Sequence, residues 1–276
     1  MDPAGRVVLV TGASSGIGWC TARAFARRGS TVVGVARRAD RLEALLRECR
    51  DTAPASEVIA GDLGDRAFAE RVVAETVERH GRLDVLVNNA ALSKHKHVLH
   101  VSPEEAEAVV RVNFLACVFT TLAALPHMLR QGGGEIVNVS SFSARVVPPR
   151  EAVYAASKAA LSAFTEGLWH DLAGTGIHAG LVIPGPIDTE IWSKLEEPPA
   201  YRGRKYPAER VSDAILEVVE KHRFEITVPR RSPPLVAASL LRRLLPALLR
   251  RAMRRMDPVP RELIEAARAR ERSSRT

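Results

Sequence analysis

The chain has 276 residues, of which 46% are hydrophobic, which is enough for one large domain with a sizeable core. Its three cysteines, Cys20, Cys49 and Cys117, are odd in number and widely spaced, which argues against a disulfide framework or a cysteine zinc site. The first residues lack the pattern of a signal peptide, and no apolar run reaches the roughly 18 residues of a membrane-spanning helix. These features predict a cytoplasmic protein.

The formal net charge of +8 is distributed unevenly. Residues 230–276 contain 13 arginines and 4 acidic residues, a net charge of +9, whereas residues 1–229 are close to neutral. The high pI therefore belongs to the end of the chain and says little about the main fold. We predict a single catalytic domain over residues 1–229, followed by a basic tail over residues 230–276.

Short apolar runs alternate with helical patterns throughout the first 229 residues. The predicted strands cover residues 6–10, 30–36, 57–63, 83–90, 135–141, 177–185 and 224–229. One helix follows the first strand as far as Arg28, and the others cover about 39–49, 68–80, 102–131 and 154–172. This alternation predicts an α/β doubly wound Rossmann fold, with a seven-stranded, mostly parallel sheet and helices on both faces.

The turn after the first strand is rich in glycine and reads TGASSGIG, residues 11–18. Glycines let a backbone turn tightly and approach a ligand, and the helix that follows offers unpaired N–H groups to a pyrophosphate. An ordinary tight turn is the alternative, but the position between strand and helix favours dinucleotide binding. The residues predicted to bind it here are Gly12, Ser14, Ser15, Gly16, Ile17 and Gly18.

The end of the second strand bears on the choice of cofactor. An acidic residue at this point commonly binds the ribose 2′-hydroxyl of NAD, whereas arginine suits the 2′-phosphate of NADP. Here the chain has Arg37 and Arg38 and no acid. The sequence therefore favours NADP(H) over NAD(H). The alternative is that both arginines only begin the next helix in solvent, and this applies most readily to Arg38.

Several further motifs along the chain match those of a known protein family in sequence and in spacing. With these, the chain resembles the short-chain dehydrogenase/reductase family, in its NADP-preferring, single-domain form, over roughly residues 5–229. The resemblance rests on TGASSGIG (11–18), Asp62 with Leu63, NNAA (88–91), Asn113, Ser141, YAASK (154–158) and PGPIDT (184–189). It implies an oxidoreductase that interconverts a carbonyl and a secondary alcohol.

The resemblance assigns catalytic roles to Asn113, Ser141, Tyr154 and Lys158. A free phenol has a pKa of about 10 and is poorly matched to proton transfer at neutral pH. Lys158 lies one helical turn after Tyr154, so its charge is expected to lower the pKa of the phenol. Tyr154 is then the general acid/base, and Lys158 also holds the nicotinamide ribose. Ser141 hydrogen-bonds the substrate oxygen, and Asn113 supports a water-mediated proton path to the lysine.

Other cofactor contacts follow from the same resemblance. Asp62 and Leu63 border the adenine, while Asn89, Ala90 and Ala91 line the adenosine side. Pro184, Gly185, Ile187 and Thr189 surround the nicotinamide. One departure is visible, because the family usually has glycine where this chain has Ala91.

The substrate side is expected to involve residues 93–97 and 142–147 and a lid at about 186–207. The lid contains Trp192, Tyr201 and Tyr206, which suggests a hydrophobic substrate, lipid-like or keto-acyl in type. In the stretch SKHKH (93–97), solvent exposure is the favoured interpretation, and contact with an anionic substrate group is the alternative. No metal site is predicted, since no further ligand is evident in the sequence.

The tail contains an amphipathic basic helix over about residues 235–256, with a break expected at Pro246. Leu241, Leu245, Leu248, Ala252 and Met256 are predicted to share one stripe. This helix could dock on its own domain or on a partner subunit, cover the pocket, or lie on an anionic membrane as a peripheral contact. Nucleic acid is not a predicted partner, because no aromatic platform accompanies the arginines. The final residues are expected to be disordered.

The prediction is an NADP(H)-dependent oxidoreductase acting on a small-molecule carbonyl or alcohol, assembled as a homodimer or homotetramer through its long helices. The first alternative is an NAD-dependent alcohol dehydrogenase. The second is a non-catalytic regulator that binds NADP(H), against which the presence of Ser141, Tyr154 and Lys158 argues.

Overall fold

The computed structural model describes residues 1–194, 201, 203–257, 259, 262 and 264–265. Its centre is a seven-stranded sheet in the order β3-β2-β1-β4-β5-β6-β9, and every strand pairing in it is parallel. The predicted Rossmann sheet is therefore confirmed. The strands are β1 Val7–Thr11, β2 Thr31–Ala36, β3 Glu57–Ala60, β4 Val85–Asn88, β5 Gly134–Val139, β6 Ile177–Pro184 and β9 Glu225–Val228.

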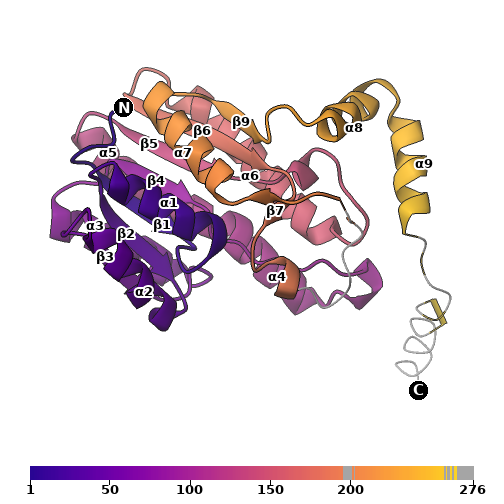
Figure 1. The fold of residues 1–276 in the computed structure, drawn as a ribbon, viewed down its shortest axis with the longest axis horizontal. Helices are drawn as coiled ribbons and strands as arrows, with labels where there is room; N and C mark the ends of the chain where they lie inside the picture. Colours follow the sequence, from indigo (N-terminus) through magenta and orange to yellow (C-terminus); the bar gives the residue numbers. More distant parts are fainter. Residues whose placement is uncertain (195–200, 202, 258, 260–261, 263, 266–276) are drawn as a thin grey trace.

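Helices cover both faces of the sheet (Figure 1). The helices α1, α2 and α7 pack on one face and α3, α5 and α6 on the other. The strands are almost continuously buried because both of their faces meet helices, which explains their uninterrupted apolar runs. The bounds are α1 Gly16–Arg27, α2 Ala39–Arg50, α3 Arg66–His80, α4 Pro103–Val110, α5 Ala116–Arg130, α6 Ala152–Asp171 and α7 Glu209–Lys221.

Helix α7 was not among the predicted helices. Its sequence, ERVSDAILEVVEK, places apolar residues at helical spacing, and Val211, Ile215 and Val219 are buried in the core with α1. The helical spacing of these apolar residues therefore indicates a helix from the sequence alone. Two short strands outside the main sheet, β7 Ile187–Asp188 and β8 Tyr206–Pro207, pair in parallel and join the two ends of the predicted lid.

The long helix predicted over 102–131 is continuous but irregular. Ser102 and Glu105 form a capping box at its start, and a π-helical turn, Arg111–Leu115, separates α4 from α5. By length and apolar composition alone, Pro103–Arg130 could cross a membrane, contrary to the sequence-based expectation that no such segment exists. However, α5 packs against α3 and α4 packs against α6, so the helix is part of the domain in this fold.

The tail forms two helices, α8 Pro233–Leu244 and α9 Pro246–Met256, with the predicted break at Leu245 before Pro246. Both lie at one side of the molecule (Figure 1). The break resets the helical register, so Leu249 is the buried residue of α9, whereas Leu245 and Leu248 of the predicted single stripe are exposed. The predicted disordered end lies largely outside the described residues.

Candidate active site

A cavity of about 710 Å³ opens where the strands of the sheet end. Every predicted catalytic and cofactor-binding residue lines it except Gly18, which packs against Gly12, and Asn113, which hydrogen-bonds Leu92 of the lining. The lining members of those sets are Gly12, Ser14, Ser15, Gly16, Ile17, Arg37, Arg38, Asp62, Leu63, Asn89, Ala90, Ala91, Ser141, Tyr154, Lys158, Pro184, Gly185, Ile187 and Thr189.

The glycine-rich turn is held by close backbone packing. Gly12 has a positive φ of 69°, and a Cβ on it would lie 2.8 Å from the Cα of Ala90. A Cβ on Gly18 would lie 2.3 Å from the carbonyl oxygen of Gly12. Asn89 fixes the turn from the neighbouring strand, because its Nδ2 donates to the carbonyl of Thr11 at 2.9 Å. Larger side chains at these glycines would push the turn out of place.

This turn fits a dinucleotide. Helix α1 begins at Gly16 beside the cavity, and Ser15, its N-cap residue, makes no side-chain capping hydrogen bond. The first N–H groups of α1 and the positive end of its dipole are therefore available to a pyrophosphate. Arg37, Asp62 and Leu63, which are predicted to contact the adenosine half of the cofactor, line the same cavity.

The two arginines after β2 differ in their surroundings. Arg37 is exposed and lines the cavity. Arg38 is the N-cap residue of α2, and its guanidinium donates to Ser14 Oγ at 3.2 Å and to Glu190 at 2.9 Å. Arg38 therefore connects the glycine-rich turn to the start of the lid and does not simply begin a helix in solvent. Because Arg38 is engaged in these contacts, the guanidinium of Arg37 is the better placed of the two to bind a phosphate.

Tyr154 and Lys158 lie on the inward face of α6, and both are buried. Burial raises the pKa of the Tyr154 phenol, and the carboxylate of Glu151 acts in the same direction, while a hydrogen bond with Ser141 opposes both. The Lys158 ammonium donates to the carbonyl of Val139 at 2.8 Å, and burial lowers its pKa to about 8. The expected lowering of the phenol's pKa by Lys158 is therefore not seen in this structure, in which burial is the largest influence on the pKa of Tyr154.

Ser141 lies two residues after the end of β5 and is the N-cap residue of a short 3-10 turn, Phe142–Ala144. Its Oγ accepts a hydrogen bond from the N–H of Ser143 at 3.2 Å. The backbone of β5 fixes the position of this hydroxyl, and the interaction with the phenol joins it to Tyr154. A substrate oxygen placed between the two hydroxyls would meet two hydrogen-bond donors.

Asn113 lies in the π-helical turn and is completely buried. Its Oδ1 accepts from the N–H of Leu92 at 2.7 Å, and its Nδ2 donates to Leu92 O and to Ser157 Oγ. Asn113 thus links the segment after β4 to α6 at Ser157, the residue before Lys158. Single π-turns of this kind occur frequently at functional sites.

Two further polar residues of the cavity were not predicted as a pair. His95 is buried, its ring lies 5.1 Å from that of Tyr154, and its Nδ1 is 3.4 Å from Glu151 Oε1. Burial lowers the pKa of His95 to about 4 and raises that of Glu151 to about 7. The solvent exposure favoured for residues 93–97 is therefore wrong for His95. The acid one helical turn before Tyr154 was the available signal for Glu151.

The neighbouring lysines are engaged within the protein. Lys96 Nζ donates to Glu105 Oε1 at 2.6 Å, and Lys94 Nζ lies 3.2 Å from the same oxygen. Lys96 has a side chain only 10% exposed, so the expectation of solvent exposure is wrong for this residue as well. The pairing with Glu105 draws both ammonium groups toward the start of α4.

The lid contributes aromatic walls. Trp192 donates from its indole nitrogen to the carbonyl of Ile187 at 2.6 Å, and its ring contacts those of His95 and Tyr201. Residues 195–200 and 202 of the predicted lid lie outside the described residues. Tyr206 pairs with Ile187 in the small sheet and closes the base of the lid.

The tail helices form the remaining wall, by way of Leu235 and Ala238 of α8 and Met253 and Met256 of α9. Arg150 pairs with Asp257 after the end of α9, which ties the tail to the segment before α6. Of the roles considered for the tail, this arrangement displays two, docking on its own domain and covering the pocket. The cavity is predominantly apolar on this side.

The comparisons with known proteins agree with this site. A family model described as short chain dehydrogenase matches residues 6–200, well over half of the chain. The chain belongs to this family. It is 36% identical over 193 residues to the 3-oxoacyl-[acyl-carrier-protein] reductase FabG of Thermotoga maritima, covering 70% of this chain and 78% of that protein. The chain is thus an oxidoreductase of the carbonyl/alcohol class.

Solved structures of family members match most of the chain. A short chain dehydrogenase/reductase from Burkholderia phymatum in complex with NAD has a TM-score of 0.82 at 25% identity, over 90% of this chain and 96% of that one. A short-chain dehydrogenase from Sphingobium yanoikuyae in complex with NADPH has a TM-score of 0.76 at 29% identity, over 88% of this chain and 95% of that one. One neighbour thus holds NAD and the other NADPH.

The burial of Glu151 predicts a pH-dependent loss of stability. Its pKa is raised to about 7 in the folded protein, above the ordinary value of 4.5, so the unfolded chain releases this proton first as pH rises. Folding is therefore penalised progressively between pH 4.5 and 7. Relative to wild type, Glu151→Gln should gain about 1–3 kcal/mol in free energy of unfolding between pH 5 and 8, measured by urea denaturation.

The matched control is Glu107→Gln, which changes an exposed glutamate on α4. It should follow the wild-type dependence on pH. A Glu151→Gln variant whose stability stays parallel to wild type over this range would show that the carboxylate ionises without a cost of burial.

Proposed function

We propose that the protein is an NADP(H)-dependent carbonyl reductase in which Tyr154 is the general acid/base. The observation that carries the proposal is the convergence of Ser141, Tyr154 and Lys158 on one wall of the cavity that also contains the glycine-rich turn. A bound nicotinamide dinucleotide supplies or accepts the hydride. The chain's own residues have the task of positioning the substrate oxygen and moving its proton.

In this proposal a substrate carbonyl accepts hydrogen bonds from Ser141 and Tyr154. As negative charge develops on its oxygen, Tyr154 transfers the phenolic proton to it. Lys158 holds the nicotinamide ribose and stabilises the phenolate that remains. Asn113 keeps α6 in place through Ser157 and supports the return of the proton. The remaining predicted contacts hold the adenosine, pyrophosphate and nicotinamide as the resemblance implies.

A screen with a carbonyl substrate and NADPH tests the assignment. Tyr154→Phe should lower kcat by about 100-fold or more, because the proton donor is lost, while NADPH binding by fluorescence titration stays as in wild type. The control is Tyr206→Phe at the base of the lid, which should keep its turnover. Wild-type turnover in Tyr154→Phe would contradict the proposed role, and the absence of turnover with intact NADPH binding in wild type would favour a regulator.

The preference for NADP(H) rests on Arg37, which is exposed at the cavity where the second strand ends. Arg37→Asp should weaken NADPH binding by about 10- to 100-fold, because a charge-assisted contact with the 2′-phosphate is replaced by repulsion, and should leave NADH binding little changed. Fluorescence titration of both cofactors measures this. Arg47→Asp on the exposed face of α2 makes the same change in charge and should bind both as wild type does.

Equal affinity of the wild type for NADPH and NADH would overturn the preference. The NAD-dependent alcohol dehydrogenase would then be the better description, and the assay would turn to alcohol oxidation with NAD.

The proposed substrate is hydrophobic, with one polar group near its carbonyl. The tail and lid supply apolar and aromatic walls, through residues such as Trp192 and Met253. Beside Tyr154, however, Nε2 of His95 is buried and has no hydrogen-bond partner among the described residues. A substrate that hydrogen-bonds to this nitrogen would satisfy it. A 3-oxoacyl compound has this combination, and long-chain 3-oxo esters are the first substrates to assay.

We also propose a homodimer or homotetramer built on the long helices. Leu122 and Leu129 of α5 and Trp169 of α6 are more than half exposed, which leaves apolar surface on the two elements that the family resemblance implicates. Burial of these side chains against a second copy would remove them from water.

The tail is further proposed as a peripheral membrane contact of a cytoplasmic protein. Leu244 and Leu248 are exposed, as are Arg250 and Arg254, and residues 232–256 contain no acid. This combination suits the boundary of an anionic bilayer, with leucines in the headgroup region and arginines at the phosphates. A hydrophobic substrate could then reach the cavity, whose wall is the opposite side of the same helices.

Flotation with vesicles tests the contact. Wild-type protein should float with vesicles containing phosphatidylserine and should stay behind with phosphatidylcholine alone, and the double variant Arg250→Glu with Arg254→Glu should lose the flotation. The double variant Arg27→Glu with Arg47→Glu, on α1 and α2, makes the same change in charge and should float. Point variants are preferable to removal of the tail, which would also remove a wall of the cavity. Equal flotation of both variants would refute the tail as the contact.

A further inference from the structure

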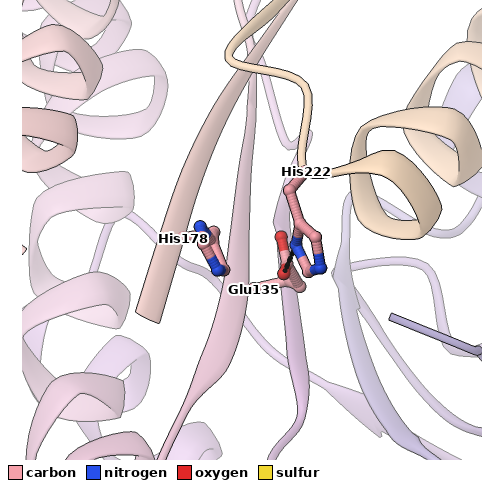
Figure 2. A group of neighbouring side chains, drawn as sticks. All are labelled: Glu135, His178 and His222. Atoms are coloured by element: carbon pink, nitrogen blue, oxygen red, sulfur yellow. Dashed lines mark hydrogen bonds and ion pairs between the residues drawn. The ribbon is translucent and has the colours of Figure 1, made fainter. Parts of the chain in front are cut away.

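A second group of ionisable side chains lies at the opposite edge of the sheet from the cavity. Glu135 stands near the start of β5, His178 is its register partner near the start of β6, and His222 ends α7 as its C-cap residue (Figure 2). The three converge although the chain between them is long. One ligand atom from each can be chosen so that all three atoms lie within 4.8 Å of one another.

Glu135 has an unusual environment for a carboxylate. Glu135 is only 1% exposed. Among the described side chains, its one hydrogen-bond partner is His222, whose Nδ1 lies 2.7 Å from Oε1 of Glu135. A buried carboxylate needs a compensating positive charge, which a single hydrogen bond from a neutral imidazole does not supply.

The two histidines leave the cluster open to solvent. The ring centroids of His178 and His222 are 4.3 Å apart with an interplanar angle of 36°, and both residues are exposed. The amino group of Met1 lies 3.3 Å from Nε2 of His222 and also donates to the carbonyls of Val219 and Glu220. Nδ1 of His222 therefore faces Glu135, while its other nitrogen faces the amino group.

We propose that Glu135, His178 and His222 form a binding site for one divalent transition-metal ion of the zinc type. Two imidazoles and one carboxylate are a common ligand set for zinc and its neighbours, whereas magnesium and calcium prefer oxygen ligands alone. Zinc bonds of about 2.0–2.2 Å place tetrahedral ligand atoms about 3.3 Å apart. Glu135 Oε1 and His222 Nδ1 are 2.7 Å apart, and the three ligand atoms lie within 4.8 Å of one another, so small rotations of the exposed rings can bring them to this spacing.

The ion would replace the proton between Glu135 and His222 and would neutralise the buried carboxylate. It would also join β5, β6 and the end of α7 more firmly than the Glu135–His222 hydrogen bond and the contact of the two rings do. Because the site lies across the sheet from Tyr154, its role is to stabilise the fold, and it takes no part in hydride transfer. The alternative is a hydrogen-bonded glutamate–histidine pair that binds no ion.

Zinc binding by the full chain tests the proposal. After treatment with a chelator and dialysis, wild-type protein should bind one Zn²⁺ per chain in isothermal titration calorimetry. Zn²⁺ at about 100 times its dissociation constant should raise the Tm by about 3–6 °C. His178→Ala, an exposed change, should abolish both effects. The matched control is His170→Ala at the exposed end of α6, which should bind as wild type does.

Cobalt gives a second reading that does not depend on any variant folding. Co²⁺ added to wild-type protein should develop the visible absorption of a four- or five-coordinate ion, and Zn²⁺ should abolish it. The proposal is overturned if wild type shows no saturable site, or if His178→Ala and His170→Ala bind zinc equally. Intact turnover in a His178→Ala variant without zinc binding is expected, and it keeps this test separate from that of the proposed reaction.

Discussion

Strands that all run in one direction end at the same edge of a sheet, and the candidate active site depends on this constraint. The parallel order places the turn after β1, Asn89 after β4, Ser141 after β5 and Pro184 at the end of β6 side by side. The same constraint gathers the starts of β5 and β6 at the other edge, where Glu135 and His178 meet. One topology therefore produces two separate clusters of polar groups, one lining the cavity and one at which we propose that an ion binds.

Burial sets the electrostatics of the catalytic cluster. In the structure the desolvation of Tyr154 and Lys158 favours the neutral form of each, and the pKa of Lys158 falls to about 8 while that of Glu151 rises to about 7. Lys158 and Glu151 therefore change their protonation state close to neutral pH, whereas the phenol of Tyr154 is held in its neutral, proton-donating form. The hydrogen bond between Ser141 and the phenol favours the phenolate and acts against burial. A tuned phenol thus depends on the polar partners that reach it, and proximity to Lys158 along the helix is insufficient by itself.

The sequence predicted those parts of the fold and site that local chemistry determines. The structure confirms the glycine-rich turn, the alternation of strands and helices and the break at Pro246. Each of these features depends on residues that are close together in the sequence. The exposure of His95 and Lys96 was mistaken because burial depends on α4 and the lid, which no local pattern reveals. His178 and His222 are 44 positions apart, and only the pairing of β5 with β6 and the length of α7 bring them together. Helix α7 is the reverse case, since the helical spacing of Val211, Ile215 and Val219 is a local pattern in the sequence.

The two faces of the tail helices α8 and α9 have different surroundings. Leu235 and Met253 complete the cavity, so the tail cannot leave the domain without opening the site to water. The leucines and arginines on the other side remain in solvent, where apolar surface is unfavourable unless something covers it. An anionic bilayer would cover the leucines and pair with the arginines, and it would leave the pair of Arg150 and Asp257 to hold the tail in place. Binding to a membrane and closure of the pocket are therefore compatible, since each uses a different face of the same two helices.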